Sequence, residues 1–171
     1  IYSLKKMQYI YKKLYKNPNL KPMNLGEGEL VKLLVNCYVA SKISFTNFVK
    51  NITENSNSLS LTTVLDAVGT DKRIGNKFLR PGGPFLGPCL PRDIVALTKF
   101  CDEIKINKIY PNSAKKLNKI SIDSLLKLTN FLKNKKIKSI GFTGIAYKPN
   151  TDFYQESIAL KLMERSNKIG L

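Results

Sequence analysis

The sequence contains no histidine, and its three cysteines, Cys37, Cys89 and Cys101, follow no regular spacing. Structural zinc sites use closely spaced pairs of cysteine or histidine, so no metal site is predicted. An odd, irregularly spaced set of cysteines is typical of a reduced chain, and we expect a cytoplasmic protein.

Long apolar runs are also missing. No stretch approaches the roughly 18 residues of a membrane-spanning helix, so no membrane association is predicted. Residues 1–6 carry two lysines, but no apolar stretch follows them as it would in a signal peptide. Because the sequence starts without methionine, we expect it to begin inside a longer protein.

Acidic residues are scarce, since 12 of them face 29 basic residues and the formal net charge is +17. Such a charge could attract nucleic acid or an anionic substrate. Only four of the basic residues are arginine, the residue that phosphate- and base-reading proteins favour for its paired hydrogen bonds. The lysines are scattered among many asparagines and isoleucines, which indicates a compositional bias. We therefore predict no nucleic-acid partner and rank nucleic-acid binding third among the candidate functions.

Helical periodicity dominates the chain up to about residue 134. The expected helices cover residues 4–16, 26–55, 61–68, 91–104 and 114–133, the last with an interruption near Ser121. The helix over residues 26–55 is apolar around much of its girth, so we expect burial on several sides. Its length suits a connection between two domains or a dimer interface. Residues 71–90, rich in glycine and proline, form an irregular stretch of functional-loop length.

The pattern changes after residue 134. Residues 137–146 are rich in β-branched and apolar side chains and predict a strand, and residues 157–168 predict a helix. A strand, a loop and a helix are the opening of a Rossmann-like α/β domain. The predicted fold is therefore mainly α, in three parts: residues 1–25, an end of an N-terminal region with a linker; 26–134, a helical central domain with a long core helix; and 135–171, the start of an α/β domain.

The loop of residues 80–89 ends at Cys89, just before a helix that Pro91 initiates. The free N–H groups and the positive end of that helix would stabilise a thiolate, and Arg92 adds positive charge. Asp93 falls in the first turn, where a carboxylate is favoured and can hold a water. A thiolate beside such a group is typical of covalent catalysis on a carbonyl. A structural cysteine at a helix end is an equally weighted alternative.

Two further groups of residues could carry chemistry. Glu29, Lys32 and Asn36 share one helix face, and a lysine beside an asparagine can polarise an oxygen. Taken alone, a surface salt bridge with a solvated asparagine is the favoured interpretation. Residues 146–152 form a loop after the predicted strand, which is the ligand-binding edge of open α/β sheets, or else a plain turn.

In order and spacing, four stretches resemble segments of the UDP-glucose/GDP-mannose dehydrogenase family, and together they cover nearly the whole chain. They are residues 29–36 with 42–47 (long central helix), 71–79 (substrate-gripping segment), 88–93 (nucleophile motif) and 146–157 (opening of the C-terminal domain). The resemblance makes residues 26–134 a dimerisation and catalytic domain and residues 135–171 the start of a UDP-binding domain. No Gly-x-Gly-x-x-Gly motif occurs, so the family's N-terminal NAD-binding domain is absent.

The resemblance implies an NAD-dependent, four-electron oxidation of the C6 alcohol of a UDP-sugar, with UDP-glucose expected first. Cys89 would form a thiohemiacetal and then a thioester, Lys32 and Asn36 would hold the oxyanion, and Asp93 would position water. The implied substrate-binding residues are Glu29, Arg73, Phe78, Arg80, Gly82, Gly83, Phe85, Leu86, Tyr147 and Lys148. The implied NAD-binding residues are Cys89, Leu90, Pro91, Arg92 and Gln155. A homodimer through the central helices is also implied, with Arg73 reaching across its interface.

Two residues depart from the family pattern. Leu86 replaces the first of two glycines before the cysteine and could crowd the sugar. Gln155 stands where an arginine usually reaches the cofactor. With the dinucleotide domain absent as well, the alternative function is a catalytically incomplete dimerisation or scaffold fragment.

Overall fold

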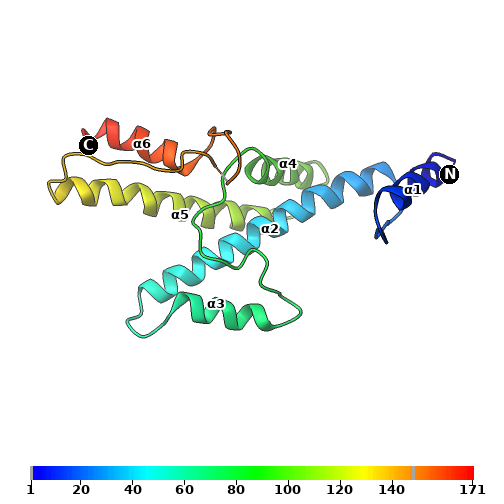
Figure 1. The fold of residues 1–171 in the computed structure, drawn as a ribbon, viewed down its shortest axis with the longest axis horizontal. Coiled ribbons are helices and arrows are strands. Elements are labelled where there is room, and N and C mark those ends of the chain that lie inside the picture. The colour runs from blue at the N-terminus through cyan, green and yellow to red at the C-terminus, as the bar shows by residue number, and fades with distance from the viewer. Residues whose placement is uncertain (1, 148) are drawn as a thin grey trace. The chain divides into compact units, whose positions relative to one another are not determined.

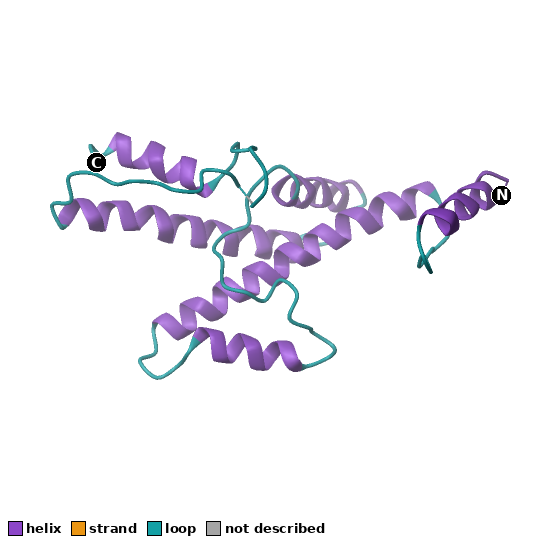
Figure 2. Cartoon of the chain, in the orientation of Figure 1, coloured by secondary structure: helices purple, strands orange, loops and turns teal. Residues whose placement is uncertain are grey.

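The computed structural model describes residues 2–147 and 149–171, which form a mainly helical fold (Figures 1 and 2). Its helices are α1 (Tyr2–Leu14), α2 (Leu25–Glu54), α3 (Leu61–Thr70), α4 (Leu90–Glu103), α5 (Ile109–Asn134) and α6 (Ile158–Lys168). The mainly α class is confirmed, and every predicted helix forms within a few residues of its expected bounds. No helix in these ranges is long and apolar enough to cross a membrane.

The chain divides into two compact units, Ile1–Lys32 and Leu33–Leu171, so the division falls inside α2. In the first unit, a reciprocal capping box starts α2. The Asn24 amide nitrogen donates to Glu27 Oε2 (2.8 Å), and the Glu27 amide nitrogen donates to Asn24 Oδ1 (2.9 Å). This pair satisfies two N–H groups that the first turn would leave without partners.

The second unit is built around the buried faces of α2, α4 and α5. Its buried apolar residues are Cys37, Ala40, Val49, Leu65, Leu79, Phe85, Ile94, Leu97, Cys101 and Ala114. Burial raises the pKa of the Cys37 thiol, and the nearby Cys101 raises it further, so the two thiols share this core. α6 packs on α5, where Arg165 donates to Asn130 and Lys133 donates to the Ile169 carbonyl.

The predicted burial of α2 on several sides is confirmed within the second unit, where Ala40 and Ser44 are buried on one side of the helix and Val49 and Thr53 on another. The remaining side of α2 carries an apolar stripe that is exposed in the single chain. We call the following residues the α2 stripe: Leu34, Tyr38, Phe45, Phe48 and Ile52.

Two expectations are wrong. Residues 137–146 form no strand; they run without helix or sheet pairing along α5 (Figure 1). A strand needs a neighbour to pair with its backbone, and the described ranges contain no other strand. The interruption near Ser121 is also absent, because the Ser121 hydroxyl donates back to the Leu117 carbonyl (3.1 Å) and α5 continues through it.

Candidate active site

Cys89 is the N-cap residue of α4, as its position before Pro91 predicted. Its side chain makes no capping hydrogen bond and is exposed, whereas Cys37 and Cys101 are buried. The Asp93 amide donates to the Cys89 carbonyl (3.0 Å), so the first turn of α4 fixes the cysteine backbone. The exposed sulfur therefore stands at the positive end of a fourteen-residue helix.

Asp93 lies one turn after Cys89 on α4 and is almost fully buried, with 2% of its surface exposed. Asn36 Nδ2 on α2 donates to Asp93 Oδ2 (2.5 Å), and Arg92 Nε donates to Asp93 Oδ1 (3.1 Å). A buried carboxylate needs such partners to remain charged. The positive charge of Arg92 is thus paired with Asp93, which the sequence pattern did not indicate.

Of the predicted Glu29–Lys32–Asn36 group, Asn36 lies in the same unit as Cys89. Asn36 belongs to the second unit and reaches α4 through Asp93. Glu29 and Lys32 belong to the first unit, where both are exposed.

An open hollow of about 440 Å³ lies in front of the glycine-rich loop. Its lining residues are Ile43, Asn76, Lys77, Phe78, Arg80, Gly82, Gly83, Pro84 and Phe85. Five of the predicted substrate-binding residues are among them: Phe78, Arg80, Gly82, Gly83 and Phe85. Lys77 and Arg80 give this hollow two cationic groups, which suits an anionic ligand.

Phe78 adopts an unusual backbone conformation at the edge of this hollow. Its φ of 66° lies in the left-handed region, which a bulky residue rarely occupies. The buried Leu79 anchors the chain directly after it, and the Thr46 hydroxyl approaches the Phe78 carbonyl (3.4 Å). The surrounding structure therefore imposes this conformation.

Residues of α2 that sequence reasoning missed hold this segment. Lys42 Nζ donates to the carbonyls of Ile74 (2.9 Å) and Gly75 (3.2 Å), and Asn47 Nδ2 donates to the Gly83 carbonyl (2.9 Å). The available signal was a set of polar residues, 42, 46 and 47, in a largely apolar helix, with 42 and 46 neighbours on one face.

Asn118 on α5 was missed as well. Its Oδ1 accepts from the Phe85 amide (2.8 Å), and its Nδ2 donates to the Phe85 carbonyl (2.9 Å). One amide side chain thus satisfies both backbone groups of a buried residue in the loop. An asparagine among the lysines of a helix gives no sequence signal of this contact.

The Tyr147 ring lies against the backbone of Gly87, two residues before Cys89. A Cβ atom on Gly87 would stand 2.5 Å from Tyr147 Cδ2, and Gly87 has a φ of 80° that only glycine adopts readily. The Tyr147 amide donates to the Phe153 carbonyl (3.1 Å), and the two rings meet edge to face at 5.5 Å. Tyr147, with Phe153 packed against it, therefore lies at the loop that carries Cys89.

The remaining predicted residues lie outside the lining of the hollow. Arg73 is exposed (88% of its side chain) and pairs with Asp71 (2.6 Å), whose pKa is lowered by the hydrogen bonds from the Arg73 side chain and backbone. Leu86, Leu90 and Pro91 are half-buried, Gln155 is exposed, and Lys148 is outside the described residues.

Residues 26–120 match the UDP-glucose/GDP-mannose dehydrogenase family, central domain, and the chain belongs to this family. It is 32% identical over 151 residues to UDP-glucose 6-dehydrogenase TuaD of Bacillus subtilis, covering 86% of this chain and 32% of that protein. A UDP-glucose dehydrogenase structure from Pyrobaculum islandicum aligns with a TM-score of 0.69 at 30% identity, covering 82% of this chain and 33% of that one.

A second solved structure, GDP-mannose dehydrogenase from Pseudomonas aeruginosa, aligns with a TM-score of 0.50 at 23% identity. It covers 97% of this chain and 38% of that one, and supports the fold alone. The chain spans about a third of the length of the relatives that it matches.

Proposed function

We propose that this chain supplies the nucleophile and part of the sugar-nucleotide site of an NAD-dependent UDP-sugar 6-dehydrogenase, with UDP-glucose as the first substrate to test. The observation that carries the proposal is the exposed Cys89 at the start of α4, one turn before the buried Asp93 to which Asn36 donates. Relatives named UDP-glucose 6-dehydrogenase support the choice of reaction and substrate.

Cys89 would react with the C6 aldehyde of the sugar. Its thiolate adds to the carbonyl carbon, and the carbonyl oxygen becomes an oxyanion that takes up a proton to give a thiohemiacetal. Bound NAD⁺ would supply the hydride acceptor for both oxidations. The first converts the C6 alcohol to the aldehyde, and the second converts the thiohemiacetal to the thioester. After the second oxidation the product is a thioester; water adds to its carbonyl, the carbon–sulfur bond breaks, and the carboxylate leaves.

Three further side chains have roles in this proposal. Lys32 and Asn36 would stabilise the oxyanion, because a cation and an amide donor both favour developing negative charge. Asp93 would orient the water or accept its proton. Its carboxylate lies one turn after Cys89 on α4 and is held by hydrogen bonds from Asn36 and Arg92.

The cofactor contacts that this chain offers are few. A dinucleotide fold requires a strand, a glycine-rich turn and a helix in sequence, which the described residues do not contain. The first turn of α4 (residues 89–92) and the uncharged Gln155 are the groups that this chain could offer.

The surroundings of Gly82 favour the proposal that a ligand binds in the hollow. Its φ is not in the left-handed region, and a Cβ atom there would meet nothing within 4 Å. The fold itself therefore does not require glycine at this position, whereas a ligand close to the backbone would. The volume of about 440 Å³ is of the size usual for small-molecule sites.

The test is NADH formation from NAD⁺ and UDP-glucose by the complete gene product. Cys89→Ala should abolish turnover, while Val95→Ala, an exposed change on the same helix, should leave it unchanged. Full turnover in the Cys89→Ala variant would refute the assignment of the nucleophile.

The α2 stripe supports a second proposal, that the chain forms a homodimer through α2. Its five members lie at spacings of four, seven, three and four residues, which matches the seam of a pair of packed helices. Phe45→Lys with Phe48→Lys should convert a dimer to a monomer in sedimentation, and Asn55→Lys should not. A dimer that binds no UDP-sugar would favour the alternative function, a scaffold fragment.

A further inference from the structure

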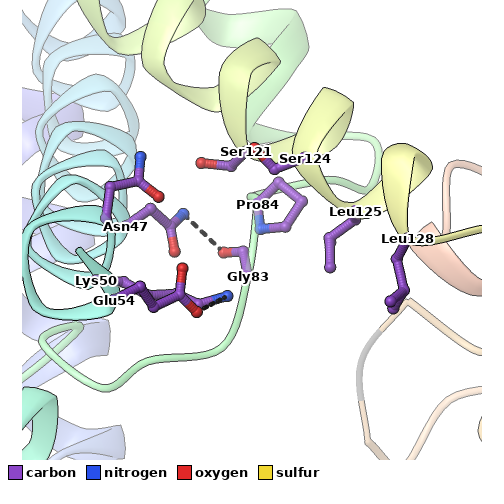
Figure 3. A pocket seen from close by; sticks show the side chains of 10 residues that line it. Asn47, Lys50, Glu54, Gly83, Pro84, Ser121, Ser124, Leu125 and Leu128 are labelled. Atoms are coloured by element: carbon purple, nitrogen blue, oxygen red, sulfur yellow. Dashed lines mark hydrogen bonds and ion pairs between the residues drawn. The ribbon is translucent and has the colours of Figure 1, made fainter. Parts of the chain in front are cut away.

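Gly83 and Pro84 border two hollows of the surface. One is the hollow described above, and the other is a pocket of about 240 Å³ between α2 and α5 (Figure 3). This second pocket is lined by Asn47, Lys50, Asn51, Glu54, Gly83, Pro84, Ser121, Ser124, Leu125 and Leu128. Gly83 and Pro84 are the two residues that line both spaces.

Packing holds the buried Phe85, but Gly83 and Pro84 are half-buried and have fewer neighbouring atoms to pack against. Gly83 contributes no side chain, and Pro84 has no N–H group with which to bond its surroundings. Hydrogen bonds to the loop backbone can therefore add to the packing of Phe85 in placing this part of the loop.

Two asparagine amides provide these hydrogen bonds, one on each side of Pro84. Asn47 on α2 reaches the Gly83 carbonyl (2.9 Å; Figure 3), and Asn118 on α5 holds both the N–H (2.8 Å) and the C=O (2.9 Å) of Phe85. Asn47 is 4% exposed and Asn118 is 7% exposed, so water competes little for these bonds.

We propose that Asn47 and Asn118 are positioning residues that set the width of the sugar-nucleotide hollow by holding residues 83–85 between α2 and α5. Neither asparagine is among the residues that line that hollow, so both act through the loop backbone. The inference rests on the proposed function for the identity of the ligand, but the hydrogen bonds that carry it do not.

The experiment compares Asn118→Asp and Asn118→Ala in the complete gene product, with Asn112→Asp as a control for charge on an exposed site of the same helix. The carboxylate that Asn118→Asp introduces can accept from the Phe85 N–H but cannot donate to the Phe85 carbonyl, and protonation restores the donor. The KM for UDP-glucose should rise about tenfold in Asn118→Asp, as expected when one buried group loses its partner. It should rise at least as much in Asn118→Ala, which leaves both Phe85 groups without their Asn118 partner.

The pH dependence separates positioning from general damage. Relative to the wild type at each pH, the KM of Asn118→Asp should return toward normal as the pH falls, whereas that of Asn118→Ala should stay high. Asn112→Asp should match the wild type throughout. If the Asn118 variants fail to fold, Asn47→Ala and Asn47→Asp, which disturb the single bond to Gly83, provide the same comparison.

Hydrogen exchange at the Phe85 amide, measured without substrate, tests the hydrogen bonds separately. Protection in the wild type that is lost in Asn118→Ala supports the hydrogen bonding of Phe85 by Asn118, and fast exchange in the wild type overturns it. An unchanged KM in variants whose Phe85 amide has become unprotected would overturn the positioning role. Absence of UDP-glucose turnover in the wild type would instead overturn the proposed function. The exchange measurement would then still test whether Asn118 holds the Phe85 backbone.

Discussion

Replacing Gly87 with alanine tests how the Tyr147 ring is held against the loop that carries Cys89. The new Cβ atom would lie 2.5 Å from Tyr147 Cδ2 and 2.7 Å from Cε2. Carbon atoms in contact stand about 3.5–4.0 Å apart, so the ring would have to move by roughly 1 Å or more. Such a movement would also disturb the edge-to-face contact between Tyr147 and Phe153.

The expected loss of stability has two parts. A side chain at a φ of 80° costs about 1–2 kcal/mol, and loss of an aromatic pair costs about 0.5–1.5 kcal/mol. Gly87→Ala should therefore destabilise the chain by about 1.5–3.5 kcal/mol in urea unfolding followed by circular dichroism.

Alanine substitutions at two other glycines distinguish the backbone cost from the cost of displacing the Tyr147 ring. Gly75 has a φ of 68° but open space around its Cβ position, so Gly75→Ala should show only the backbone cost of about 1–2 kcal/mol. Gly82 has neither constraint, and Gly82→Ala should leave the unfolding midpoint almost unchanged.

The outcome that would refute the reasoning is a loss in Gly87→Ala no larger than that in Gly75→Ala. The double variant Gly87→Ala, Tyr147→Ala provides the confirming measurement, because removing the ring should remove the excess cost. An excess that persists without the ring would mean that Tyr147 is not its source.

Three further predictions follow from the described side chains. Gly82→Ala should weaken UDP-glucose binding in calorimetry although folding is unaffected. Unchanged binding would show that the ligand does not lie close to Gly82. Cys89 should react quickly with an aromatic disulfide reagent while the buried Cys37 and Cys101 react only on unfolding; three fast thiols would contradict their burial. The Asp71 carboxyl should titrate below its ordinary value in an NMR titration, so its pair with Arg73 should persist above that lowered pKa and be lost as the pH falls through it; Arg73→Ala should return the titration to normal.

Local patterns in the sequence were sufficient for the helices and for the position of Cys89. Pro91 in a first turn, a glycine- and proline-rich loop before it and an apolar repeat after it all act through neighbouring residues. The α5 interruption was wrong because Ser121 can bond back to its own helix, which a reading of residue type alone does not distinguish from a break.

The predicted strand failed for a different reason. Residues 137–146 have the composition of a strand, but a strand is formed by pairing, and the described ranges provide no partner for its backbone. Apolar periodicity correctly predicted burial on several sides of α2. It could not show which side stays exposed in the single chain, because burial depends on what lies opposite each side, and the α2 stripe has nothing packed on it within the described residues.

By itself, then, the sequence determined the helical class, the family, and Cys89 as the residue at the start of α4, because these depend on residue types and spacings along the chain. Only the tertiary structure decided the rest of the candidate site. Asn36 meets Asp93, Asn118 holds Phe85, and Tyr147 covers Gly87. Each of these contacts joins residues more than thirty positions apart, at distances that the packing of α2, α4 and α5 sets and no local spacing encodes.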